Sequence, residues 1–427
     1  MLSPGQPFVY LLAYLAVLYI RPHEFVPFFM GWPVLPILLV LATVIWLSNQ
    51  KKDFEAPQFW LIPVLAFLMA LSVALSGWPG GALVVLGEFG PVVLLFFLIA
   101  TTTDSLSRLR LIFLVLSVCA AVISLHGVDQ LEAGIGWTGA ELSQDTRITY
   151  LGFLNDPNDL AMALVMILPM LLYLAPMVGR LVRLGVYAAA GLVAYAVYLT
   201  NSRGSVLALG AMVFMYGILR FGLIKSLVVI PTILLPLIAL GPSRMGEMSA
   251  DEESAEHRIE AWYEGFQMLT SRPLFGVGKG QFADHAGLTA HNSYVLAFSE
   301  LGLVGYFFWL SNIVIAWLML RRIVRTTASP DDDPQAAARW QELRVAGQTL
   351  WFGYVGGLVS AFFLSRSYVV ILYVHIALIV AVFQMARRER PDMAPMRWGD
   401  LWGKLLVGSL ASVVVMWLIT RVLLSFT

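Results

Sequence analysis

The feature that most constrains this chain is a succession of apolar runs, each about 15 to 25 residues long. A helix of about 20 apolar residues crosses the hydrocarbon core of a bilayer, and within lipid a helix satisfies all of its own backbone polar groups. The chain is 59% hydrophobic and 13% charged, whereas soluble domains are about half apolar and about a quarter charged. The sequence therefore predicts an all-α polytopic membrane protein.

About twelve runs are predicted to span the membrane, and residues 401–425 are a candidate for a thirteenth span. The twelve lie at approximately 7–20, 33–48, 58–76, 82–100, 110–126, 158–176, 184–201, 204–220, 226–241, 292–320, 346–364 and 367–386. We expect a bundle divided into three parts: helices one to nine within 1–241, a large periplasmic loop at 242–291, and the remaining helices with cytoplasmic loops at 292–427. No basic segment precedes the first run and no small-residue cleavage site follows it, so we expect a retained helix.

Lysine and arginine are unevenly shared between the two sets of connections. Cytoplasmic loops carry an excess of these residues. With the N-terminus in the cytoplasm, most of the 27 basic residues fall in the even-numbered connections and in the tail after residue 386. We therefore expect a bacterial inner-membrane protein whose odd-numbered connections face the periplasm. The remaining basic residues need a separate explanation, and they are Arg21, Arg147, Arg203, Arg244, Arg258, Arg272, Lys279, Arg366 and Arg421.

Net charge, cysteine and histidine content argue against several functions. Basic and acidic residues both number 27, so no nucleic-acid partner is indicated. The single cysteine, Cys119, lies in an apolar run, where we expect it to pack as a small core residue. The other histidines are scattered and no metal-ligand spacing is present, so we expect no metal and no cofactor. These scattered histidines are His23, His126, His257, His285 and His375.

Two outer loops are long, at 127–157 and 242–291. A loop of about 50 residues is rarely structureless, and residues 252–270 have apolar side chains at helical spacing. We expect an amphipathic helix there, ended by Pro273 and the glycines after it. On the cytoplasmic side of the membrane, residues 326–344 are expected to form a solvated loop leading into a short helix.

Several outer cations could carry chemistry. Arg203 lies between two apolar runs with almost no loop, where a charge at membrane depth costs roughly 2.5–3.5 kcal/mol or more. We favour a functional role for it, although an arginine reaching lipid headgroups is the alternative. Arg258 on the loop helix has Trp262 one turn later, and the alternative for it is a solvated surface residue. Arg147 and Arg366 are further outer cations for which a structural role is equally compatible.

Residues 273–282 form a glycine-rich run that contains Lys279 and superficially resembles a phosphate-binding loop. It is not a Walker A motif, and no strand–helix unit surrounds it. Backbone N–H groups in such a turn can still bind an anion. The alternative, which we favour, is a tight turn that re-enters the membrane.

His291-Asn292 opens the tenth span, and Glu300 lies inside that span. A neutral imidazole at the head of a membrane helix is a candidate general base. An intramembrane carboxylate is a functional candidate too, although it could pair structurally with an arginine. The run Asn155-Asp156-Pro157-Asn158-Asp159 is interpreted as an ordinary helix start.

Together these residues suggest an anionic ligand on the outer face. Arginine suits phosphate because its planar donors match phosphate oxygens in pairs. The main lipid-borne pyrophosphates on that face of a bacterial membrane are undecaprenyl-diphosphate carriers of glycans. The cations concerned are Arg147, Arg203, Arg258, Lys279 and Arg366, around His291.

With these motifs in order, the sequence resembles the O-antigen ligase and O-antigen polymerase superfamily. His291-Asn292, nine residues, then Gly302-x-x-Gly305 matches the ligases' H-[NSQ]-x9-G-x-x-G pattern without a gap. The motifs cover about residues 200–305, and each alone is weak. The other three are Ser202-Arg203-Gly204, Arg258-x-x-x-Trp262 and Arg272-Pro273-Leu-Phe-Gly276-x-Gly278-x-Gly280-x-Phe282.

The resemblance implies a glycosyltransferase that moves a glycan from undecaprenyl diphosphate to an acceptor hydroxyl, without metal or nucleotide and with inversion. By motif, Arg203 and Arg258 would hold the pyrophosphate, and His291 would orient or deprotonate the acceptor hydroxyl. We add Arg147, Lys279, Arg366, Asn292, Glu300 and Trp262 as candidate substrate-binding residues. Membrane lipids would surround the bundle, and a chain-length regulator is a candidate partner for its cytoplasmic loops.

The acceptor is left open by these motifs. Ligases use lipid A–core, polymerases another lipid-linked glycan, and O-oligosaccharyltransferases a protein. A rival class is a transporter or flippase for a lipid-linked glycan, which would need polar groups through the membrane depth and usually repeat-related broken helices. A scaffold protein is a further alternative, and its outer arginines would tolerate replacement.

Overall fold

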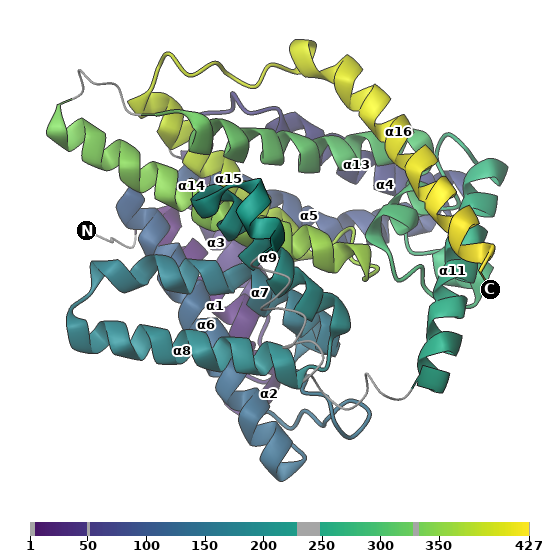
Figure 1. Ribbon diagram of the computed structural model, residues 1–427, viewed down its shortest axis with the longest axis horizontal. Coiled ribbons are helices and arrows are strands. Elements are labelled where there is room, and N and C mark those ends of the chain that lie inside the picture. Colours follow the sequence, from purple (N-terminus) through teal and green to yellow (C-terminus); the bar gives the residue numbers. More distant parts are fainter. Residues whose placement is uncertain (1–4, 49–51, 229–247, 328–332, 427) are drawn as a thin grey trace.

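The computed structural model describes residues 5–48, 52–228, 248–327 and 333–426, and within them the chain is helical apart from connecting segments and two isolated β-bridges. Figure 1 shows the longer helices side by side in one bundle. The helices are α1 (Pro7–Ile20), α2 (Pro22–Phe25), α3 (Val34–Ser48), α4 (Gln58–Leu75), α5 (Pro79–Thr102), α6 (Leu106–Ala133), η1 (Gly152–Leu154), α7 (Pro157–Leu174), η2 (Ala175–Met177), α8 (Arg180–Leu199), α9 (Arg203–Phe221), α11 (Met248–Ser271), α12 (Phe282–Ala286), α13 (Ser293–Arg325), α14 (Pro334–Phe362), α15 (Val370–Glu389) and α16 (Trp398–Leu424).

Nine helices in the described part of the chain are long and apolar enough to cross a membrane: α4, α5, α6, α7 with η2, α8, α9, α13, α15 and α16. Two shorter apolar helices, α1 and α3, join them. The polytopic helical architecture is therefore confirmed, whereas the count of twelve or thirteen spans stays a prediction. The candidate at 401–425 falls within α16, and the predicted span at 226–241 lies largely outside the described residues.

Helix boundaries differ from the sequence-based ones where polar residues extend a helix beyond its apolar run. α6 continues to Ala133, so the outer loop predicted from residue 127 begins later. α14 begins at Pro334, so the short helix expected within 326–344 is the polar first part of one long helix. The amphipathic helix predicted at 252–270 is present as α11.

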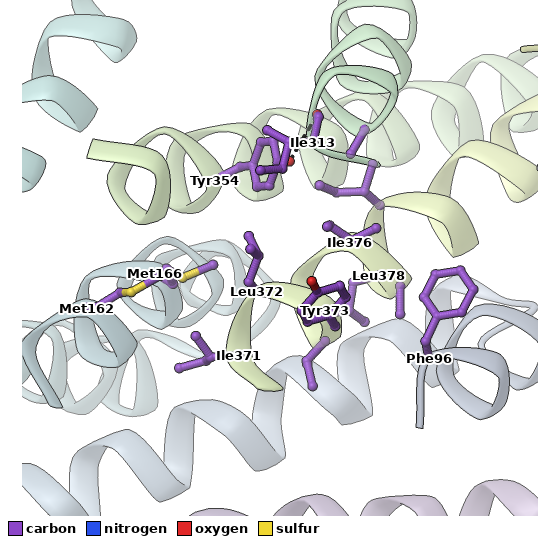
Figure 2. Packing of buried hydrophobic residues seen from close by; sticks show 14 of the residues in the cluster. Phe96, Met162, Met166, Ile313, Tyr354, Ile371, Leu372, Tyr373, Ile376 and Leu378 are labelled. Carbon is purple, nitrogen blue, oxygen red and sulfur yellow. Dashed lines mark hydrogen bonds between the residues drawn. The ribbon is translucent and has the colours of Figure 1, made fainter. Parts of the chain in front are cut away.

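The centre of the bundle is α15, of which 89% of the apolar window is buried. It packs against α5, α13 and α14, and the hydroxyl of Tyr354 donates a hydrogen bond to the Ile313 carbonyl at 3.0 Å. Figure 2 shows Ile371, Leu372, Tyr373, Ile376 and Leu378 of α15 among Phe96 of α5, Met162 and Met166 of α7, Ile313 of α13 and Tyr354 of α14. Because residues 371–386 are all buried, α15 lies inside the bundle and does not face lipid.

Small residues on α14 bring two helices close to it. A Cβ at Gly353 would lie 2.5 Å from the Met166 carbonyl oxygen of α7, and a Cβ at Gly356 would lie 2.5 Å from Val165 and 2.8 Å from the sulfur of Met212 on α9. Small residues allow such close approach of membrane helices. As a result, α7 and α9 are both fixed against α14.

α13 is one long helix with a break at Gly302, whose φ is 63°. The glycine-rich loop fills this break. The N–H groups of Val277 and Gly278 donate to the carbonyls of Ser299 and Glu300, both at 3.0 Å. In return, two N–H groups after the break, those of residues 303 and 304, donate to the carbonyls of residues 273 and 274. The loop therefore satisfies backbone groups that lipid could not.

Candidate functional site

His291 lies in a turn at the head of α13. Its φ is 48°, in the left-handed region, and the next residue, Asn292, is the fully buried N-cap of the helix. The Asn292 Oδ1 accepts the N–H groups of Tyr294 at 2.9 Å and Val295 at 3.1 Å. An asparagine at this position satisfies free N–H groups of the first turn. Asn292 therefore positions His291 by fixing the turn that carries it.

Trp262 holds the same turn from α11. Its Nε1 donates to the carbonyl of Ala290 at 2.9 Å, and its ring packs edge-on against Phe362. Arg258 lies one turn earlier on α11, and Gly265 lies seven residues later, where a Cβ would lie 2.5 Å from Val295 of α13. Residues at i, i+4 and i+7 share one helix face, so the face that packs on α13 also carries Arg258.

Arg203 is the first residue of α9. Gly204 follows it, and a Cβ there would lie 2.9 Å from the Cβ of Phe363 at the end of α14. Arg203 is exposed at the end of the bundle. The pKa of Arg258 is lowered first by its own burial and then by the nearby charge of Arg203. Two cations from α9 and α11 thus face the same region.

Arg366 belongs to the turn between α14 and α15. Its backbone N–H donates to the Ser293 Oγ at 2.9 Å, and that hydroxyl donates to the Leu364 carbonyl at 2.6 Å. The Ser367 hydroxyl donates to the Ser293 carbonyl at 2.7 Å. The Nε of Arg366 donates to the Oδ1 of Asp159 at 2.5 Å. These bonds join the turn to the heads of α13 and α7.

The charges around His291 come from three directions. The pKa of its imidazole is lowered from 6.5, first by burial and then by Arg258 and Arg366, while Asp156 opposes the shift. Burial also tends to lower the pKa of Arg366, but Asp159 and Asp156 raise it overall. A lowered pKa keeps the imidazole neutral near pH 7, which is the form that can accept a proton.

Arg147 braces two of these elements. Its Nε donates to the Thr200 carbonyl at 2.8 Å, and its Nη2 donates to the Asn158 Oδ1 at 2.9 Å. Thr200 follows α8 and precedes Arg203, whereas Asn158 lies in the first turn of α7. Arg147 therefore connects the segment that carries Arg203 to the head of α7.

Lys279 and Glu300 lie at the glycine-rich loop and are not among the charges that shift the pKa of His291. The Nζ of Lys279 contacts the Oε2 of Glu88 on α5 at 2.5 Å. Glu300 is buried, and its Oε1 accepts the N–H of Phe282 at 3.4 Å. Both side chains therefore contact the loop or its neighbours, while their predicted role in substrate binding stays a prediction.

Sequence reasoning did not identify Asp156 and Asp159 as members of the site. Asp156 is the N-cap of α7 that the sequence indicated, and its Oδ1 accepts the Asn158 N–H at 2.8 Å. Asp159 in the next turn is buried and paired with Arg366. The available signal was two carboxylates at one helix start, in a connection predicted to lie on the same side of the membrane as the unexplained arginines.

Within the described ranges, no group of three or more His, Cys, Asp and Glu side chains is arranged to hold a metal ion. Residues 188–310 match the model of a protein family described as O-antigen ligase. This range contains Arg203, Arg258, Trp262 and His291, and it confirms the resemblance read from the sequence. No curated protein matches the chain.

Proposed function

Because residues 188–310 match a family described as O-antigen ligase, we propose that this multi-pass membrane protein is a glycosyltransferase of bacterial surface-polysaccharide biosynthesis. Its donor is a glycan linked to undecaprenyl diphosphate, and its acceptor is a hydroxyl group presented at the periplasmic face of the inner membrane. The observation that carries the proposal is that Arg258 and Arg366 come from two segments to the half-buried His291, with Arg203 of a third segment close to Arg258.

The proposed step is a direct displacement at the anomeric carbon. His291 takes the proton from the acceptor hydroxyl while its oxygen forms a bond to that carbon. The bond between the carbon and the phosphate oxygen breaks on the opposite side, so the configuration is inverted. Undecaprenyl diphosphate leaves with the electron pair, and Arg203 and Arg258 stabilise the charge that develops on its oxygen.

Two observations support this assignment of roles. The lowered pKa of His291 suits a base at neutral pH. Burial lowers the pKa of Arg258, and the nearby charge of Arg203 lowers it further, so the two cations repel each other. Such an arrangement gains free energy when a pyrophosphate lies between them.

Variants of the central residues test the mechanism. His291→Ala should lower glycan transfer by roughly 10²–10⁴-fold, and Arg203→Gln by roughly 10²–10³-fold, with normal membrane insertion. His285→Ala is the matched control, since His285 is exposed in the same outer segment and contacts only the backbone carbonyl of Gln281 within the described residues. Near-normal transfer by both His291→Ala and Arg203→Gln would sink the mechanism.

Reconstitution decides the acceptor, for which a repeat-unit polymerase with the same site is the alternative. Purified protein is mixed with undecaprenyl-diphosphate-linked repeat units, with and without lipid A–core, and the products are sized on a gel. Product only with lipid A–core means a ligase, and a ladder without it means a polymerase. An intact donor in both reactions would favour a protein acceptor or a lipid-linked glycan transporter.

A further inference from the structure

Asp159 is a buried carboxylate at the outer end of the bundle, and its side chain is only 5% exposed. It comes from the first turn of α7, while its partner Arg366 comes from the turn between α14 and α15. A buried charge is costly unless it is paired. The pairing explains how Asp159 is accommodated, but it does not explain why a carboxylate stands there rather than an apolar residue.

The geometry of Arg366 suggests the reason. Its Nε is engaged by Asp159 at 2.5 Å, its Nη1 contacts the Ser365 carbonyl at 3.3 Å, and its backbone N–H is held by Ser293 at 2.9 Å. Its Nη2 donates to no group within the described residues, and the side chain remains 38% exposed. Nε and Nη1 are therefore fixed, and Nη2 is the nitrogen of the guanidinium that can donate to another group.

The support behind Asp159 is rigid. α7 is held on α14 through the close approach at Gly353, and its head is braced by Arg147 through Asn158. Ser293, which holds the backbone of Arg366, is the residue two positions after His291. Arg366 and His291 are thus tied to the same helix head.

We propose that Asp159 is a positioning residue, which holds Arg366 beside His291 so that its Nη2 can donate to a phosphate oxygen of the donor. This inference rests on the proposed function and extends it to a residue outside the matched family range. Charge-assisted hydrogen bonds of this kind are directional, so the carboxylate fixes orientation as well as charge. Asp159 itself does not touch the reacting atoms.

A double-mutant cycle in the reconstituted reaction tests the inference. Asp159→Asn should lower transfer by about 10- to 100-fold through misplacement of Arg366. In an Arg366→Gln background the same change should have no further effect, because Asp159 acts only through Arg366. Asp284→Asn, at an exposed outer carboxylate, is the control. Wild-type transfer by Asp159→Asn, or additive losses in the double variant, would overturn the proposal.

Chemical rescue gives a readout that a purely structural role would not move. Millimolar guanidinium should partly restore transfer by Arg366→Ala, because Asp159 can bind the free cation where the side chain was. The rescue should vanish in Arg366→Ala/Asp159→Asn and persist in Arg366→Ala/Asp159→Glu. Equal rescue with and without the carboxylate would refute the positioning role. Asp159→Glu also serves if Asp159→Asn fails to fold.

The two proposals can fail separately. Transfer by the wild type with no effect of Asp159→Asn leaves the glycosyltransferase standing and removes the inference. If the wild type transfers nothing, the proposed function fails, and binding of inorganic pyrophosphate still tests Asp159. Weaker binding by both Asp159→Asn and Arg366→Gln than by the wild type would retain the positioning role, and equal binding by all three would end it.

Discussion

At the scale of the residue, the site divides into groups that would act and groups that hold them. His291, Arg203 and Arg258 are the groups assigned to chemistry. Trp262 and Asn292 fix the turn of His291 through hydrogen bonds to Ala290 and to the first turn of α13. A buried donor or acceptor left without a partner costs about 1–3 kcal/mol, so loss of Trp262 or Asn292 should destabilise the turn that carries His291.

The pH dependence of transfer follows from the charges around His291. A base with a lowered pKa stays neutral, and hence active, until the pH falls through that pKa, so the acidic limb should lie below 6.5. Arg258→Gln removes a cation that lowers the pKa, so the limb should move to higher pH. The measurement is the rate of transfer against pH for the wild type and for Arg258→Gln. The other charged residues near the site, Arg203, Arg366, Asp156 and Asp159, are the same in both proteins. A limb that does not move would separate His291 from the base role.

At the scale of the element, the glycine-rich loop and α13 form one unit. The loop resembles a phosphate-binding turn in composition, yet two of its N–H groups are engaged by the carbonyls of Ser299 and Glu300. Three of its glycines have positive φ, at 69°, 114° and 83° for Gly276, Gly278 and Gly280. The loop therefore has a structural role: it supplies hydrogen-bond partners to the backbone of α13 where that helix is broken. Its sequence is constrained because the loop backbone lies close to the backbone of α13.

Substitution of two glycines of the loop distinguishes the effect of backbone strain on stability from the effect of a steric clash. Gly276→Ala would place a Cβ 2.4 Å from the backbone of Glu300, whereas a Cβ at Gly280 meets nothing within 4 Å. Gly280→Ala should cost about 1–2 kcal/mol, the cost of the left-handed conformation alone. Gly276→Ala adds a steric clash to that cost, so it should lower the apparent Tm of the detergent-solubilised protein several times as much as Gly280→Ala does. Equal losses for the two variants would contradict the packing of the loop on α13.

At the scale of the whole molecule, the segments that carry the candidate site residues meet at one end of the bundle. α11 lies at the same end as the C-terminal end of α16, which it contacts (Figure 1). The heads of α7, α9 and α13 and the turn before α15 gather there through the charges and hydrogen bonds that connect them. Helix N-termini favour anions, which suits a site proposed to bind pyrophosphate.

The single cysteine makes the orientation of this end testable. Cys119 is only 3% exposed, so the wild type should react slowly with a membrane-impermeant maleimide. Asp284→Cys should be labelled in intact spheroplasts, because α12 follows α11 in the loop that we propose to be periplasmic. Arg339→Cys, near the start of α14, should be labelled only after the membrane is opened. The reverse pattern would invert the proposed topology and place the site in the cytoplasm.

The sequence by itself determined the helical membrane class, the amphipathic helix and the cations that need a partner, because run length, helical period and charge placement are local properties of the chain. Tertiary structure alone decided which polar groups meet. Arg366 pairs with Asp159 across 207 residues, and Lys279 pairs with Glu88 across 191. A sequence pattern identifies a charge that needs a partner, but several carboxylates satisfy that need equally. Helix packing at glycines such as Gly353 and Gly204 then selects one partner, because it fixes which helix ends lie within reach.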